Sequence, residues 1–161
     1  MSEANTNPKA HRSSVNRRAF LGSGAAILGA GLVATRVDAA EPTADERANL
    51  KIVNDFMAAW TARDLAKIMA PLGDAIVYRA SETAEPIKGK AAVEARLKGI
   101  VDRVDRFDVI ESWARGPMVI NDRIDRFTSG NLKAWHGVGV FFLQDGKIVE
   151  WLDYTVSRDR G

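Results

Sequence analysis

The sequence predicts an α+β domain in which helices cover one face of an antiparallel sheet. Apolar residues recur at helical spacing in the first half of the domain, up to residue 101, and at alternate positions after residue 106. Glycine-containing pairs interrupt the second half, as turns between neighbouring strands do. Helices that precede such a run of strands can bury their apolar sides only against one face of the sheet.

The helical half begins with Thr43-Ala44-Asp45-Glu46, a capping-box pattern, followed by Leu50, Val53, Met57 and Trp60 at helical spacing. A second, short helix stops near the proline and glycine at positions 71 and 73. The expected elements are, in order, helix 44–63, helix 65–69, strand 75–80, loop 81–88 and helix 90–101.

The strand half is divided by three breaks, Gly116-Pro117, Ser129-Gly130-Asn131 and Asp145-Gly146. Between them the side chains alternate with a period of two, which is typical of strands linked by hairpins. We expect a four-stranded meander with strands 106–115, 118–127, 132–143 and 148–156.

The first forty residues have the pattern of an export signal. Asn16-Arg17-Arg18-Ala19-Phe20-Leu21 contains a twin-arginine pair, and the apolar stretch 20–33 is shorter than the roughly 20 residues that span a bilayer. Small residues up to Ala40 offer a cleavage point near Ala39/Ala40; the alternative is a tail with an accidental arginine pair. We expect a twin-arginine signal peptide at 1–40, a domain at 41–161, the twin-arginine export machinery as a partner, and a periplasmic or secreted protein without a stable membrane anchor.

The domain itself is close to neutral. Of the chain's 23 Lys+Arg and 21 Asp+Glu, the first forty residues hold five and two, which leaves 18 basic and 19 acidic groups. The basic balance therefore belongs to the expected signal, and nucleic-acid binding has no electrostatic support. The absence of cysteine excludes disulfides, thiolate metal ligands and a cysteine nucleophile. With one histidine in the domain, we expect no metal site and no cofactor.

Two carboxylates and an arginine are the candidates for chemistry. Asp153 lies in Trp151-Leu152-Asp153-Tyr154, and Arg123 and Asp125 share one face of the strand 118–127. Both faces of that strand mix polar and apolar residues, so periodicity does not decide which face is inside. The three side chains form either a buried acid–base group or a surface ion pair beside an exposed aspartate.

The sequence resembles the limonene-epoxide hydrolase family, within the cone-shaped fold shared with ketosteroid isomerase and nuclear transport factor. The residues that carry the resemblance are Tyr78, Asn121-Asp122-Arg123-Ile124-Asp125, Gly139-Val140-Phe141, Gly146-Lys147-Ile148 and Trp151-Leu152-Asp153-Tyr154. It covers residues 45–156. It implies a strongly curved antiparallel sheet, with the three helices over its concave face and a deep pocket between them.

The resemblance also implies roles. Asp153 would be the base that takes a proton from water, Asp125 the acid that protonates an epoxide oxygen, and Arg123 the link between them. Tyr78 would hold the water, and the pocket would be lined by Trp151, Trp135, Ala80 and Phe141. Neighbouring carboxyls in unequal environments can be protonated and ionised at the same pH. A homodimer is implied as well, and the outward apolar residues Val138, Val140 and Phe142 fit it.

One position departs from the family pattern. The asparagine that would bind the water two residues after the tyrosine is Ala80 here, and a methyl group forms no hydrogen bond. Ser81, Glu82 or Glu85 of the following loop are the candidate substitutes. Otherwise hydrolysis is slow or gives way to another acid–base reaction.

His136 is the domain's only histidine, and its face depends on the Asp145-Gly146 turn. A two-residue turn would place His136 on the Asp153 face. A turn with a glycine bulge would instead place Trp135, Gly137, Gly139 and Phe141 there, with room for a ligand beside the glycines. The resemblance favours the bulge and an outward His136.

Three functions are compatible with these residues. The first is a cofactor-independent epoxide hydrolase that acts on a small apolar substrate. The second is an isomerase, cyclase or carbon–carbon lyase that uses the same pocket, and the third is a non-catalytic small-molecule binding protein.

Overall fold

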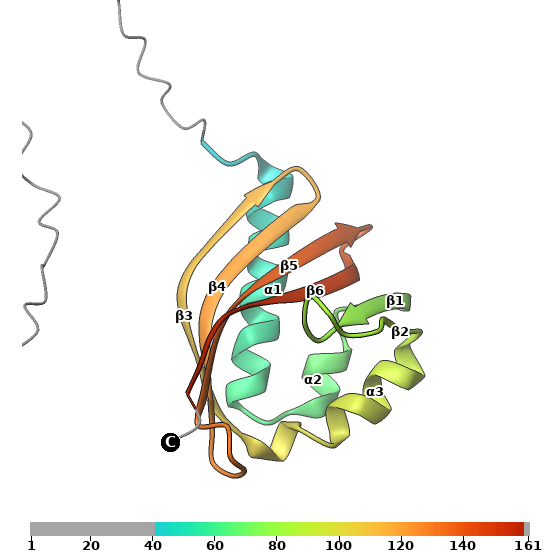
Figure 1. The fold of residues 1–161 in the computed structure, drawn as a ribbon. Helices are drawn as coiled ribbons and strands as arrows, with labels where there is room; N and C mark the ends of the chain where they lie inside the picture. Colours follow the sequence, from blue (N-terminus) through green and yellow to red (C-terminus); the bar gives the residue numbers. More distant parts are fainter. Residues whose placement is uncertain (1–40, 160–161) are drawn as a thin grey trace, which may run out of the picture. The chain divides into compact units, whose positions relative to one another are not determined.

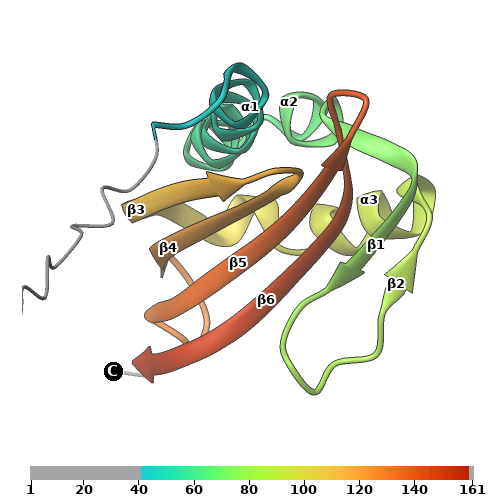
Figure 2. The ribbon, with the colours of Figure 1, turned by 90° about the horizontal axis from the view of Figure 1, so that it is seen from above.

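The computed structural model describes residues 41–159, so the expected signal peptide lies outside the described residues. Six strands form one curved sheet in the order β2-β1-β6-β5-β4-β3, and helices pack on one of its faces (Figures 1 and 2). The predicted α+β class is confirmed. Within residues 41–159 no helix is long and apolar enough to cross a membrane.

The helices lie close to their predicted positions. They are α1 (Ala44–Thr61), α2 (Leu65–Met69), α3 (Lys90–Lys98) and the short 3-10 helix η1 (Val101–Arg103). The capping box is formed: Thr43 N donates to Glu46 Oε2 at 2.7 Å, and Glu46 N donates to Thr43 Oγ1 at 3.2 Å. The predicted third helix is shorter than expected, because its last turn tightens into η1 after Gly99.

The strands are β1 (Leu72–Arg79), β2 (Ile87–Lys88), β3 (Val104–Arg115), β4 (Met118–Phe127), β5 (Ala134–Gln144) and β6 (Lys147–Asp159). The last four form the predicted antiparallel meander. The expectation of an antiparallel sheet throughout is wrong at β1, which runs parallel to β6. The long connection through α3 and the meander permits this pairing, which a short hairpin could not.

The β5–β6 hairpin combines the two turn geometries considered from the sequence. Asp145 and Gly146 both have positive φ, 52° and 72°, and form a two-residue turn that pairs Gln144 with Lys147. The register then shifts in β6, where Phe142 pairs with Glu150 and leaves Val149 as the extra residue. The bulge is therefore in the strand rather than in the turn. It has the predicted effect, because Gly139 pairs with Asp153.

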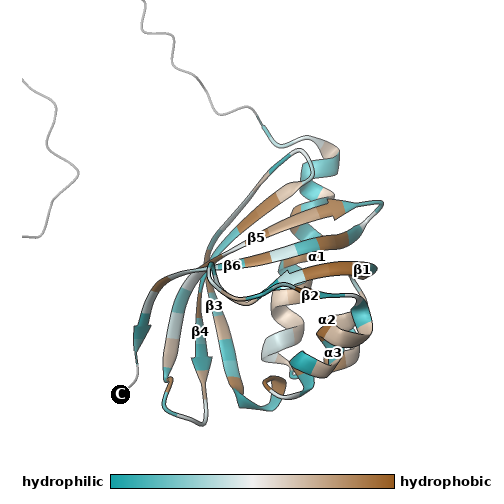
Figure 3. Cartoon of the chain, turned by 45° about the vertical axis from the view of Figure 1, so that its right-hand side comes forward, coloured by the Kyte–Doolittle hydropathy of each residue, from teal (hydrophilic) through white to brown (hydrophobic). Residues whose placement is uncertain are grey.

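An aromatic core lies between α1 and the sheet. Phe56 and Trp60 of α1 pack against Trp151 of β6, with ring centroids 5.1 and 6.0 Å from it, and Phe141 of β5 lies beside them. Figure 3 shows that β1 and much of β5 are apolar. Along β4 the alternate residues Val119 to Asp125 are buried, which settles the face that periodicity left open. Arg123 and Asp125 thus point toward the helices.

Candidate active site

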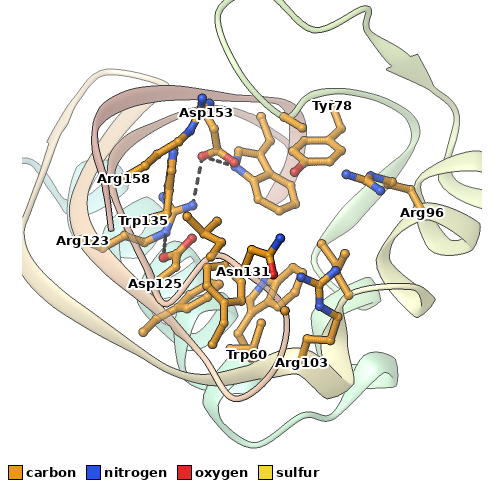
Figure 4. A pocket seen from close by; sticks show the side chains of 18 residues that line it. Trp60, Tyr78, Arg96, Arg103, Arg123, Asp125, Asn131, Trp135, Asp153 and Arg158 are labelled. Carbon is orange, nitrogen blue, oxygen red and sulfur yellow. Dashed lines mark hydrogen bonds and ion pairs between the residues drawn. The ribbon is translucent and has the colours of Figure 1, made fainter. Parts of the chain in front are cut away.

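A cavity of about 620 Å³ lies on the buried side of the sheet. Side chains from α1, β1, α3, β3, β4, β5 and β6 line it (Figure 4). Its wall is largely aromatic, with Trp60, Phe107, Trp135 and Trp151. An apolar cavity with a few converging polar groups is the usual form of a small-molecule site.

Arg123 joins two aspartates on one wall of this cavity. Arg123 Nε donates to Asp125 Oδ1 at 2.9 Å, and Arg123 Nη2 donates to Asp153 Oδ1 at 3.0 Å (Figure 4). All three residues are buried, with exposed fractions of 1%, 6% and 4%. The alternative of a surface ion pair is therefore wrong.

The sheet register explains why these groups meet. Arg123 and Asp125 are two residues apart on β4, and Asp153 lies on β6, one strand beyond β5. The intervening strand places glycines opposite the polar residues, because Arg123 pairs with Gly137 and Gly139 pairs with Asp153. The long arginine side chain can thus cross β5 at two residues that carry no side chain of their own.

The glycines make room for protein side chains rather than for a ligand. A Cβ at Gly139 would lie 2.5 Å from Arg123 Nη1 and 2.7 Å from the Phe141 ring. A Cβ at Gly137 would overlap the Trp135 ring. The Arg123 guanidinium also lies 5.2 Å from the Trp135 ring centroid and 5.3 Å from that of Phe107. Aromatic packing therefore holds the guanidinium in place in addition to its two ion pairs.

The two carboxyls have unequal surroundings. Asp153 Oδ1 accepts a second hydrogen bond from Trp151 Nε1 at 2.9 Å, whereas among residues 41–159 only Arg123 donates to Asp125. Burial raises the pKa of Asp125 to about 7, although the Arg123 charge acts in the opposite direction. Burial also raises the pKa of Asp153, against Arg123 and the Trp151 hydrogen bond. Since Asp153 has more donors, we expect the charge to stay on Asp153 and the proton on Asp125.

Each carboxyl also keeps one oxygen available. The Oδ2 atoms of Asp125 and Asp153 accept no hydrogen bond from residues 41–159, and both side chains line the cavity. Tyr78 of β1 lies beside them, stacked on Trp151 with a centroid distance of 4.0 Å. Its hydroxyl makes no hydrogen bond within the described part of the chain, and burial raises its pKa above the ordinary value. It can therefore donate to or accept from a bound molecule.

The family follows from a match that spans most of the domain. Residues 47–159 match the model of the limonene-1,2-epoxide hydrolase (LEH) catalytic domain. The chain belongs to this family. An LEH-like epoxide hydrolase from M. tuberculosis is similar, with 27% identity over 69% of this chain and 84% of that chain, and a TM-score of 0.62.

Other solved structures share the fold of this LEH-family chain and show the fold alone. An NTF-2 like protein of unknown function from Burkholderia xenovorans is 17% identical over 71% of this chain and 88% of its own, with a TM-score of 0.61. A de novo designed protein with a curved β-sheet is 16% identical over 68% and 85%, with a TM-score of 0.59. The cone-shaped fold alone thus implies no particular reaction.

Most residues singled out from the sequence meet in the cavity of this LEH-family domain. Tyr78, Trp135 and Trp151 line it together with Ala80 and the aspartate–arginine group. Phe141 does not: it is fully buried and stacks behind Trp151, with a centroid distance of 5.9 Å. Its expected place in the substrate pocket is corrected to a place in the core that supports the pocket wall.

His136 lies on the other face of the sheet, as favoured from the sequence. Its Nε2 is 2.8 Å from Asp122 Oδ1, also on the outer face. The neighbouring Trp135 instead points into the cavity and donates its Nε1 proton to Thr155 Oγ1 at 3.1 Å. His136 therefore takes no part in the candidate active site.

No residue of the loop after Ala80 that was considered from the sequence replaces the water-binding asparagine of the family pattern. Ala80 lines the cavity, but Ser81, Glu82 and Glu85 are not among the lining residues. The Glu82 carboxylate instead accepts a hydrogen bond from Thr155 N at 3.3 Å. The water-binding role considered for these three loop residues has no support in the geometry.

Sequence reasoning missed several polar residues of the cavity. They are Arg96 on α3, Arg103 on η1, Asn131 in the β4–β5 loop and Arg158 near the end of β6. No motif contains them, and the sequence around each residue does not distinguish a position at the cavity from one that faces solvent. Within the described residues no group of three His, Cys, Asp or Glu is placed to bind a metal ion.

Proposed function

We propose that this protein is an epoxide hydrolase that adds water to an epoxide on a small, largely apolar molecule. One observation supports it above all: two buried carboxyls, bridged by Arg123, each present a free oxygen to an aromatic cavity. Membership of the LEH family supports the reaction class.

Asp125 is the general acid in this proposal. An epoxide opens to an alkoxide, which is a poor leaving group unless it is protonated as the carbon–oxygen bond breaks. A carboxyl with a pKa of about 7 holds its proton near neutral pH and is acidic enough to release it. The Asp125 side chain lines the cavity, and its Oδ2 accepts no hydrogen bond from residues 41–159, so the epoxide oxygen would bind there.

Asp153 is the general base. It takes one proton from the water whose oxygen attacks the epoxide carbon, and Tyr78 holds that water through its unpaired hydroxyl. One carbon–oxygen bond forms and one breaks, giving a diol. Afterwards Asp153 carries the proton and Asp125 has lost one. Transfer of that proton from Asp153 to Asp125 through solvent restores the starting state.

The reaction type is tested by supplying limonene-1,2-epoxide in ¹⁸O-labelled water. The proposal predicts a diol that carries one labelled oxygen. Turnover to an unlabelled product would replace hydrolysis by isomerisation or another rearrangement. Binding without turnover of this or related epoxides would favour a carrier function.

Ala80 favours a second candidate, an isomerase, cyclase or carbon–carbon lyase. With no side-chain donor or acceptor at this position, the nucleophilic water has one ligand fewer than the family pattern provides. The same acid and base could then move a proton within the substrate. The labelled-water experiment separates this candidate from hydrolysis directly.

We also propose a homodimer formed through the outer face of the meander. Trp113, Ile120, Val140 and Leu152 are paired across β3, β4, β5 and β6 and form an apolar row on that face. Trp113 is 43% exposed, and contiguous apolar patches on a surface mark sites of protein–protein contact. Sedimentation should give a dimer, and Val140→Glu should give a monomer. A monomeric wild-type protein would contradict this proposal.

Export by the twin-arginine route is proposed on the sequence pattern alone. Replacing both Arg17 and Arg18 by lysine should leave the protein in the cytoplasmic fraction of a bacterial host. Unchanged export of that variant would contradict this proposal.

A further inference from the structure

The cavity carries more positive charge than the proposed reaction uses. Among the described residues, its lining contains four arginines and two aspartates, and both aspartates are bonded to Arg123. The other three arginines have exposed side chains, so they lie where the cavity meets solvent. Figure 4 shows Arg96 and Arg103 on the side of the cavity away from Arg123 and Asp125.

Arg96 projects from α3 into the cavity, toward Tyr78 (Figure 4). The acidic residue closest to it along the helix is Glu94, but Glu94 Oε1 is paired with Lys98 Nζ at 2.9 Å. Within residues 41–159 Arg96 forms no ion pair. Its charge is thus available to a bound molecule.

Arg103 is held against the β4–β5 loop. A Cβ at Gly130 would lie 2.7 Å from Arg103 Nη2, and Gly130 has a φ of +88°, so this close approach depends on glycine. Thr128 N donates to Arg103 O at 2.9 Å and fixes the backbone beside it. The nearby Asp105 is paired with Arg106 at 2.7 Å, and Arg103 forms no ion pair among the described residues.

Asn131 follows in the same loop and points into the cavity between these two arginines and the catalytic aspartates (Figure 4). Arg158 differs from the two arginines: its Nη2 donates to Thr155 Oγ1 at 3.1 Å, and the backbone N of that threonine donates to Glu82. Arg96 and Arg103 are therefore the pair whose charge is least compensated.

We propose that Arg96 and Arg103 bind an oxyanion group of the substrate, in the first place a carboxylate. Guanidinium groups suit carboxylates because their planar donors match the two oxygens. The apolar body of the substrate would lie along the tryptophan wall, and its reactive end at Asp125 and Asp153. The preferred substrate is then an acid with an apolar chain, and a neutral epoxide, which lacks the anion contact, is turned over with a higher KM. That an acid is the substrate of the reaction rests on the proposed function, whereas that an acid binds in the cavity rests on the cavity residues alone.

Binding is measured first, without chemistry. Saturated alkanoic acids of increasing chain length, their primary amides and the matching alkyl sulfates are titrated against the wild-type protein. Quenching of the fluorescence of Trp60, Trp135 and Trp151 in the cavity wall reports occupancy. We expect an acid to bind about tenfold more tightly than its amide, with a preference that weakens as salt is added. Equal affinity of acid and amide at every chain length would overturn the inference.

Glutamine variants assign the preference to the two arginines. Arg96→Gln and Arg103→Gln should each lower the acid-to-amide affinity ratio, and the double variant should bring it close to one. Lys98→Gln on the same helix and Arg106→Gln on the following strand serve as matched controls, because both are exposed and neither lines the cavity. A preference for the acid that persists in the double variant would overturn the assignment.

Turnover of an ω-epoxy alkanoic acid and its amide separates this inference from the proposed function. Diol formation from both with equal KM would support the hydrolase and contradict the anion site. Selective binding of acids without diol formation from either compound would support the anion site and contradict the hydrolase. If the protein is a hydrolase and also has the anion site, the acid has a lower KM than the amide. The double variant, with Arg96→Gln and Arg103→Gln, then has equal KM values for the two compounds.

Discussion

Gly139 lies directly against the guanidinium of Arg123, so that a Cβ on this glycine would come within 2.5 Å of Arg123 Nη1. The glycine of one strand thus determines where the arginine of the next strand can lie. The geometry of both carboxyls depends on this contact, because Arg123 bonds to Asp125 and Asp153 at once.

Gly139→Ala should therefore disturb the site and the core together. The added methyl group forces Arg123 or the Phe141 ring to move, and we expect a loss of about 1–3 kcal/mol in the free energy of unfolding with a lower kcat. Chemical denaturation and diol formation measure the two effects. Gly99→Ala is the matched control, because a Cβ there makes only an ordinary contact, 3.5 Å from Arg96 O. Equal stability of the two variants would contradict this account.

Arg123→Gln should destabilise the fold strongly. It leaves two buried carboxyls without their shared counter-charge, and breaking a buried pair in this way costs about 3–5 kcal/mol. The loss should be smaller at acid pH, where both carboxyls are protonated. Denaturation at several pH values tests this. Arg106→Gln, which removes exposed ion pairs, should have a much smaller effect. A pH-independent loss would show that packing of the arginine, rather than its charge, is what matters.

The raised pKa of Asp125 predicts a pH dependence of stability. Between its ordinary value of 3.8 and about 7 the unfolded chain releases the proton while the folded protein keeps it. This group should therefore lower the free energy of unfolding as the pH rises through that interval, with no further effect above it. Asp125→Asn removes this titration. The free energy of unfolding of the variant should therefore rise relative to that of the wild type as the pH increases, and the two values should be closest at acid pH. A stability difference that did not change with pH would argue against the raised pKa.

Ala80→Asn should speed up hydrolysis. An amide at this position of the cavity wall, two residues after Tyr78, could supply the hydrogen bond to water that the methyl group cannot. We expect kcat for diol formation to rise about tenfold, the value of roughly one additional hydrogen bond. Ala80→Leu is the control, since it fills the same space without a polar group and should lower kcat. If both substitutions lower kcat alike, the water does not bind beside residue 80.

Helix caps, turns and strand periodicity could be predicted from the sequence because residues close together in the chain determine them. The capping box at Thr43, the turns at Gly116 and Gly146 and the period-two strands all form where their residues indicate. The parallel pairing of β1 with β6 was not predictable in this way, because it joins segments separated by the whole meander. The bulge at Val149 was also missed, since only its effect on the register distinguishes it from regular strand.

Some residues of the candidate site could be predicted from the sequence and others could not. Asp125, Arg123 and Asp153 could be chosen from the sequence through their motifs, although which face of β4 is buried depended on packing. Arg96 and Arg103 could not, because an arginine in a short helix has the same sequence pattern whether its side chain faces solvent or a cavity. Phe141 was misplaced because a residue on the cavity side of a strand can still be covered by its neighbour, here Trp151.

The rate of diol formation by Asp153→Asn, measured beside the wild type in ¹⁸O-labelled water, tests the central proposal most directly. Asparagine keeps the size of the side chain and can still accept hydrogen bonds from Arg123 and Trp151, but it cannot take a proton from water. The account predicts a labelled diol from the wild type and a rate at least about 100-fold lower for the variant. A variant that forms the labelled diol at the wild-type rate would contradict the role of Asp153 as the base.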